Sequence, residues 1–101
     1  MDEREKAAAE LRRKRGTEVV LHALGGFVKY HDTRIVDFDR QMIRLDTGGW
    51  KTVTTKRRLN QVSEAFGLGF RVYQEDYRWY VDYNGKTHQF FRESFNMRRA
   101  T

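Results

Sequence analysis

Apolar and polar residues alternate through much of the chain, and this pattern of period two predicts β-strands. In residues 41–46, for example, Ile43 and Leu45 would point to one face of a strand and the residues between them to the other. Strands are predicted over residues 17–24, 27–30, 33–38, 41–46, 70–74, 77–83 and 86–91. A short helix is an alternative for the first of these segments.

Short turns join the predicted strands into hairpins. Asn84-Gly85 lies between two alternating segments and suits a type I′ turn, in which both central residues have a positive φ. Glu75-Asp76 is predicted to join the strands on either side of it, although this pair is less typical of a two-residue turn. Residues 92–101 predict no definite element.

One segment, residues 55–66, has the period of an amphipathic helix. Its apolar stripe consists of Leu59, Val62 and Phe66. Thr54 or Thr55 is a suitable residue to cap its N-terminus, and Gly67 is placed to end it in a left-handed conformation. The opposite face is polar, so this helix should lie on the surface with one side against a core.

Residues 2–15 are strong helix formers, with acidic residues first and basic residues last, as the helix dipole favours. Leu11 is the only large apolar side chain in this segment, so we expect a flexible helical arm with little surface to bury. The basic run Arg12–Arg15 could contact phosphates, but it is also typical of a solvated helix with a favourable charge order.

Together these elements predict an α+β domain in which an antiparallel sheet packs one main amphipathic helix on one face. The expected division is an arm over residues 1–16, a single domain over residues 17–97 and a basic tail over residues 98–101. With two-residue turns, Val72 lies opposite Trp79, and one face of the late strands becomes an apolar face that should receive the helix. That face contains Phe70, Val72, Trp79, Val81, Tyr83 and Phe90.

The opposite face of the same strands alternates aromatic rings with guanidinium groups. It contains Arg71, Tyr73, Arg78, Tyr80, Gln89 and Phe91. Bases of a single strand stack on exposed rings while cations follow the phosphates, so all of these except Gln89 are candidate nucleic-acid contacts. Three structural alternatives remain: aromatic residues favour strands, Arg–Tyr pairs stabilise strands without a ligand, and other elements could cover this face.

A second candidate site lies at the start of the predicted helix. Its members are Thr54, Thr55, Lys56, Arg57 and Arg58. If the helix begins near Thr55, the cations fall in its first turn, where the dipole disfavours them and free amides attract an anion. Hydroxyl groups, amides and cations after a Gly-Gly loop suit a phosphate. Alternatively, acidic residues such as Asp46 neutralise the cluster within the fold.

The chain has 101 residues, and 20 Lys and Arg against 14 Asp and Glu give a net charge of +6. This charge suits nucleic acid, an acidic protein surface or anionic lipid, but it is also ordinary for a small soluble domain. The lack of cysteine excludes disulfides and thiolate sites. No apolar stretch could span a membrane and no signal peptide is visible, so we expect a cytosolic protein without a membrane partner.

No motif predicts catalysis, a metal or a cofactor. His22, His31 and His88 are far apart in sequence and lack further donors at ligand spacing. The glycine-containing loops do not form a phosphate-binding fingerprint, and neither Ser63 nor Ser94 has a nucleophile motif around it. We therefore expect a protein that is not an enzyme and holds no cofactor.

The stretch GGWKTVTTKRRLNQVSEAFGLGF, followed by VYQEDYRWYVDYNG, resembles small hypothetical proteins encoded in tailed-bacteriophage genomes. The resemblance covers about residues 35–85 and carries over no functional residue. It implies a phage protein acting in the host cytoplasm. Nucleic-acid binding is the function expected first. The alternatives are an inhibitor that binds an acidic surface of a host protein or defence complex and, with less support, a virion or assembly component.

Overall fold

The computed structural model describes residues 2–90 and 92–100, which form two helices and eight strands in two antiparallel sheets. In chain order the elements are α1 (Glu3–Arg12), β1 (Thr17–His22), β2 (Gly25–Tyr30), β3 (Thr33–Phe38), β4 (Met42–Asp46), α2 (Val53–Phe66), β5 (Phe70–Glu75), β6 (Arg78–Tyr83), β7 (Lys86–Gln89) and β8 (Ser94–Arg98). The larger sheet has the order β1-β2-β3-β4-β8 and the smaller the order β5-β6-β7. The predicted α+β class is confirmed.

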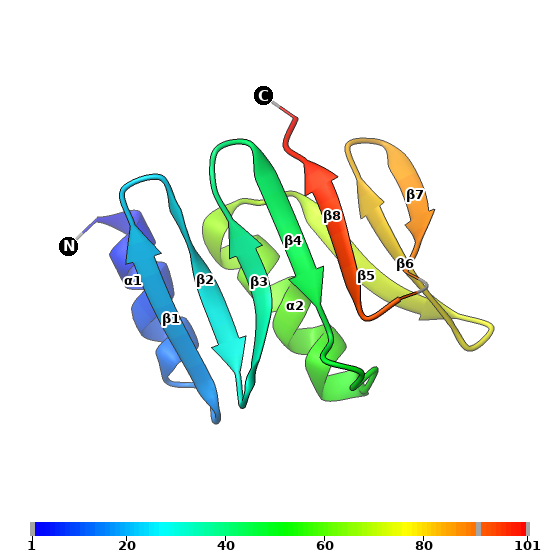
Figure 1. Ribbon diagram of the computed structural model, residues 1–101. Coiled ribbons are helices and arrows are strands. Elements are labelled where there is room, and N and C mark those ends of the chain that lie inside the picture. Colours follow the sequence, from blue (N-terminus) through cyan, green and yellow to red (C-terminus); the bar gives the residue numbers. More distant parts are fainter. Residues whose placement is uncertain (1, 91, 101) are drawn as a thin grey trace.

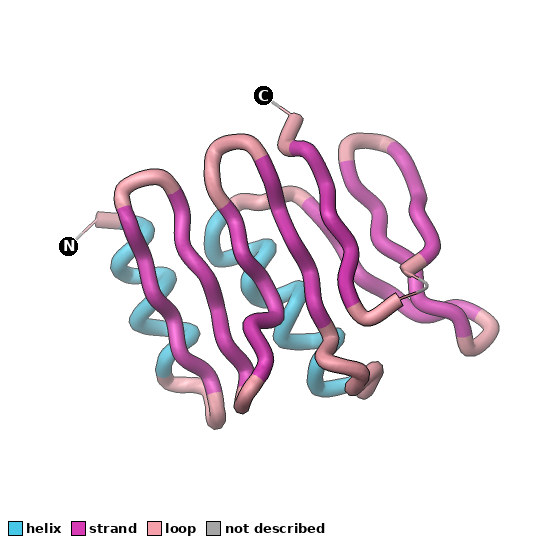
Figure 2. The backbone as a smooth tube through the Cα atoms, in the orientation of Figure 1, coloured by secondary structure: helices cyan, strands magenta, loops and turns pink. Residues whose placement is uncertain are grey.

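Both helices cover the same face of the five-stranded sheet (Figure 1). α1 lies behind β1 and β2, α2 lies behind β3 and β4, and the two helices contact each other. Figure 2 shows that, among the described residues, no helix covers the opposite face. The buried core side chains of this sheet include Val19, Val28, Val36, Ile43, Leu45 and Met97. Each large apolar side chain buried here stabilises the fold by about 1.5–3 kcal/mol.

The predicted strands are confirmed to within two residues at each described end, and the first segment is a strand and not the alternative helix. Phe91, which was expected in the last predicted strand, lies outside the described residues. The C-terminal segment, for which no element was predicted, contains β8. β8 pairs with β4, so that Met97 lies opposite Ile43 and Phe95 opposite Leu45.

The N-terminal helix packs against the domain and does not extend from it as a free arm. Ala8 and Leu11 are buried, and α1 contacts both β1 and α2. Arg4 donates hydrogen bonds of 2.9 and 2.7 Å to carbonyl oxygens at the two ends of the β1–β2 turn, and Arg12 donates one of 2.9 Å to the carbonyl of Val19. A count of large apolar side chains missed these anchors because one is an alanine and two are arginines that bind backbone oxygens.

The helix α2 begins two residues earlier than predicted. Thr52 is its N-cap, because its hydroxyl accepts a hydrogen bond of 3.1 Å from the amide of Thr55. The basic run therefore starts at the fourth helical residue, Lys56, and the expectation that all three cations lie in the first turn is corrected. Several neighbouring threonines suit an N-cap equally well, so composition could not choose among them. The predicted left-handed cap at Gly67 is confirmed, with a φ of 61°.

The smaller sheet has the predicted faces but a different register in its first hairpin. The turn is Asp76-Tyr77, which places Val72 opposite Val81 and corrects the expected pairing with Trp79. A shift of two residues leaves every side chain on its original face. The predicted apolar face is accordingly buried, apart from the half-buried Tyr83.

Side chains of α2 pair with the free edge of β5. Asn60 donates a hydrogen bond of 2.8 Å to the carbonyl of Val72 and accepts one of 2.7 Å from its amide. Ser63 makes the same kind of two-way contact with Phe70, at 2.6 and 3.0 Å. The helix thus satisfies backbone groups that an edge strand would otherwise leave open.

Replacing Asn60 by alanine should lower the free energy of unfolding by about 2 kcal/mol, because a buried amide and a buried carbonyl lose their partners. Urea unfolding measures the change. Asn96→Ala is a matched control on the exposed side of β8 and should shift stability by less than about 0.5 kcal/mol. Equal losses in the two variants would contradict this role of Asn60.

Candidate functional site

The predicted cluster at the start of α2 is spread over different environments. Thr55 is buried and bonded to the capping Thr52, so its hydroxyl and amide are already used. The Lys56 ammonium lies 5.9 Å from the centre of the Trp79 ring, whereas Arg57 is exposed to solvent. Thr54 is also exposed. The structure therefore does not bring these side chains together on one surface.

Arg58, the last member of this cluster, is only 9% exposed. Its guanidinium carbon lies 5.1 Å from the centre of the Tyr30 ring, and Nη1 donates a hydrogen bond of 2.6 Å to Gln61. Its Nε has no hydrogen-bond partner, and no ion pair to Arg58 occurs within residues 2–90 and 92–100. Arg58 is thus a buried cation held by a ring and an amide, and it is inaccessible to a bound phosphate chain.

The second predicted surface, on the smaller sheet, does bring its described members together. The Tyr73 and Tyr80 rings stack with centres 5.6 Å apart, and the Arg71 guanidinium lies 5.0 Å from the Tyr73 ring centre. Arg78 is exposed at the end of the same face. Phe91 lies outside the described residues.

Acidic groups balance the charge of this Arg–Tyr face. Glu75 and Asp82 share it by strand alternation, and the Tyr73 hydroxyl donates a hydrogen bond of 3.1 Å to Asp82. Partial burial raises the pKa of Tyr73; a hydrogen bond with Thr87 acts to lower this pKa, and the contact with Asp82 acts to raise it. The phenol is therefore neutral at neutral pH, and the face presents rings that already stack on one another without an excess of positive charge.

Several cationic side chains border a shallow groove at the end of α1, which we call the α1 groove. It is lined by Arg12, Arg13, Lys14, Arg15, Gly16, Thr17, Glu18, Lys29, His31 and Asp32 and has a volume of about 650 Å³. Five of these residues are Lys or Arg, and two are acidic. Arg13 lies 3.6 Å from Glu10 in an exposed ion pair, which contributes little stability and leaves the guanidinium accessible.

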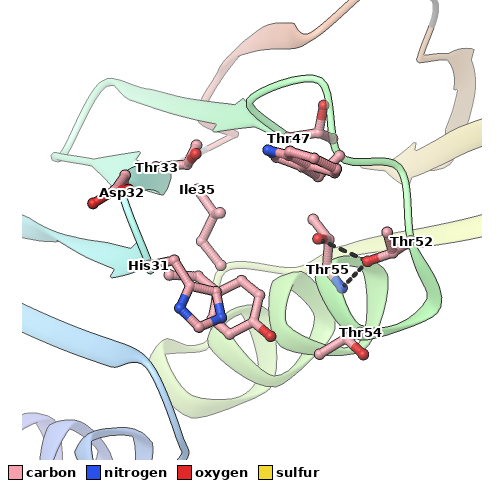
Figure 3. A pocket seen from close by; sticks show the side chains of 10 residues that line it. His31, Asp32, Thr33, Ile35, Thr47, Thr52, Thr54 and Thr55 are labelled. Atoms are coloured by element: carbon pink, nitrogen blue, oxygen red, sulfur yellow. Dashed lines mark hydrogen bonds between the residues drawn. The ribbon is translucent and has the colours of Figure 1, made fainter.

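A deeper pocket of about 510 Å³ lies between the β2–β3 turn and the start of α2 (Figure 3). We call it the aromatic pocket. It is lined by Tyr30, His31, Asp32, Thr33, Ile35, Thr47, Trp50, Thr52, Thr54 and Thr55. Figure 3 shows His31, Asp32, Thr33 and Ile35 on one side and Thr52, Thr54 and Thr55 at the start of α2 on the other. Of the residues predicted for a binding site, only Thr54 and Thr55 line it.

The loop from β4 to α2 that carries Trp50 is held by hydrogen bonds. The amide of Trp50 donates to the carbonyl of Thr47 at 3.0 Å, and the amide of Thr47 donates to the carbonyl of Glu93 at 2.8 Å. Gly48 and Gly49 have φ values of 62° and 86°, which let the loop turn sharply. The Trp50 side chain remains 69% exposed although its backbone is fixed.

Comparison with protein families matches residues 5–99 to the model described as Kyanoviridae Gp96 protein. The chain belongs to this family. The expected resemblance to tailed-phage proteins is confirmed, and the Gp96 match extends it from about residues 35–85 to α1 and β8. Searches of curated proteins and of solved structures found no match.

Two negative findings apply to the described part of this Gp96-family chain, residues 2–90 and 92–100. No three His, Asp or Glu side chains lie close enough together to hold a metal ion. Neither α1 nor α2 combines the length and apolar character needed to cross a membrane.

The sequence contains one signal for the aromatic pocket, and that signal is Trp50. Trp50 follows two glycines in a predicted loop, and a large aromatic side chain in such a loop is not expected to be buried in the core. The lining residues Tyr30 and His31 gave no such signal, because they lie some twenty residues away in sequence and come to line the same pocket as Trp50 only in the folded chain.

Proposed function

We propose that this Gp96-family protein binds nucleic acid, with the phosphate backbone along the α1 groove. The supporting observation is that five cationic side chains from two separate elements surround one groove. The helix dipole accounts for Arg12 and Arg13 at the end of α1, but Lys14 and Arg15 follow the helix and Lys29 belongs to β2. Several cations along one groove would bind the phosphates of a strand independently of its sequence.

The other two surfaces support this function less. The start of α2 offers one exposed cation, Arg57, because its neighbours pack against rings. The Arg–Tyr face has balanced charges and stacked rings, so it would add contacts of the kind that bases make but little attraction for phosphate.

Replacing Arg13, Lys14 and Arg15 by glutamine should weaken binding to a random oligonucleotide about tenfold or more at low salt. The slope of log affinity against log salt should fall by about 2, since each lost phosphate contact on a single strand removes about 0.7. Fluorescence anisotropy across a salt series measures both quantities.

The matched control replaces Arg57, Arg71 and Arg78 by glutamine, which removes the same charge from exposed positions outside the α1 groove. Its affinity and slope should stay close to those of the wild type. Equal losses of affinity in both variants would show that the net charge of the protein alone attracts the oligonucleotide. No binding at low salt would overturn the proposal, and a host protein retained from a nuclease-treated lysate would then favour an inhibitor of a host protein.

A further inference from the structure

We propose that the aromatic pocket holds one unpaired base of the strand whose phosphates lie in the α1 groove, an inference that rests on the proposed function. His31 and Asp32 line both the groove and the pocket, so the two hollows adjoin each other. A strand that leaves the groove past His31 therefore meets the pocket next. Unpaired bases can turn out of a strand and enter such a pocket, while paired bases cannot.

The rings around the pocket suit a flat heterocycle. Three of its lining residues, Tyr30, His31 and Trp50, carry aromatic rings. Tyr30 and His31 touch, with ring centres 4.3 Å apart, and Trp50 is largely exposed despite its size. A base gains stacking energy against rings of this kind whatever its sequence. The volume of about 510 Å³ falls in the range of small-molecule sites.

The polar lining of the pocket favours a base over a phosphate. None of the described residues that line it is Lys or Arg, and Asp32 carries its one formal negative charge. A phosphate placed inside would lose water without gaining a counter-charge from the lining. Threonine hydroxyls such as those of Thr33 and Thr54 both donate and accept hydrogen bonds, as the edge of a base requires.

Contacts within the fold hold the walls of the pocket in place. Its Trp50 loop is tied to Glu93 and to the end of β4, its α2 side is fixed by the Thr52 cap, and Tyr30 packs against the buried Arg58. Binding a base would therefore order few side chains and cost little conformational entropy, so most of the stacking energy would contribute to the affinity.

The test compares a short oligothymidylate with an abasic oligonucleotide of the same length, at equal salt. The wild type should bind the oligothymidylate about tenfold or more tightly, which corresponds to one stacked base. Trp50→Ala should remove this preference and leave the salt slope unchanged, whereas Trp50→Phe should restore most of it. Tyr77→Ala is the control, because Tyr77 is a 95% exposed aromatic residue in the β5–β6 turn and lines neither the α1 groove nor the aromatic pocket.

Each outcome separates this inference from the proposed function. Equal binding of both oligonucleotides by the wild type would overturn the base pocket and leave phosphate binding in the α1 groove standing. A preference that survives in Trp50→Ala would also overturn it, because the base would then lie elsewhere. Failure of both oligonucleotides to bind at low salt would overturn the proposed function together with the pocket.

Discussion

Replacing Gly25 by alanine should destabilise the protein by about 3 kcal/mol or more. A Cβ atom at this position would overlap the carbonyl oxygen of Phe38 and lie 2.7 Å from the Cα of Asp39. Both neighbours are backbone atoms, so no change of rotamer relieves the contact, and β2 would have to move away from the end of β3. Urea unfolding followed by circular dichroism measures the loss.

The control for this prediction is Gly67→Ala at the end of α2. Gly67 has a φ of 61°, but within the described structure no atom lies within 4 Å of an added Cβ. The Gly67→Ala variant should lose only about 1–2 kcal/mol of stability, which is the cost of holding a residue with a Cβ atom in the left-handed conformation. A Gly25 variant no less stable than the Gly67 variant would show that β2 and β3 separate easily at this point.

Replacing Arg58 by glutamate should destabilise the protein by about 3 kcal/mol, whereas Arg57→Glu should change stability by less than about 0.5 kcal/mol. The two residues are adjacent in sequence, but Arg58 is buried over the Tyr30 ring and Arg57 is exposed. A carboxylate at position 58 would lose its hydration and meet the negative face of that ring. Thermal and urea unfolding of the pair measure the difference.

Arg58→Met separates the charge of this side chain from its volume. Methionine fills similar space without a buried charge or an unpartnered Nε, so its stability should lie within about 1 kcal/mol of the wild type. A loss as large as that of Arg58→Glu would mean that the contacts with Tyr30 and Gln61 carry the stability. Equal behaviour of Arg57 and Arg58 variants would contradict their different burial.

The register of the β5–β6 hairpin shows a limit of sequence patterns. Alternation placed Phe70, Val72 and Val81 on the buried face correctly, but a shift of two residues preserves the same alternation. The turn itself gave no help, because Asp76 and Tyr77 both adopt a positive φ that is rare for residues other than glycine. Asn84-Gly85 forms the expected two-residue turn, and the strands that it joins have the predicted register.

Long-range packing decided the elements that sequence reasoning missed. The strand β8 is short, and it becomes ordered by pairing with β4, which lies about fifty residues earlier. The helix α1 has one large apolar side chain, yet the buried Ala8 and the backbone contacts of Arg4 hold it in place. Neither effect leaves a local period in the sequence.

The candidate site follows the same division. The sequence pattern favoured the cations at the start of α2 as the phosphate site and offered the basic run Arg12–Arg15 only as a possible further contact, and it pointed to no role for Trp50. Folding buries Arg58, places Lys56 beside a ring and brings Lys29 to the end of α1. These differences decide which cations remain accessible.

The sequence by itself determined what depends on neighbours along the chain: the strands, the apolar stripe of α2, its glycine cap and the excess of positive charge. The tertiary structure decided what depends on residues remote in sequence, including the pairing of β8, the burial of Arg58 and the placing of Tyr30 and Trp50 around one pocket. The physical reason is that periodicity assigns each side chain to a face, whereas only packing determines what covers that face.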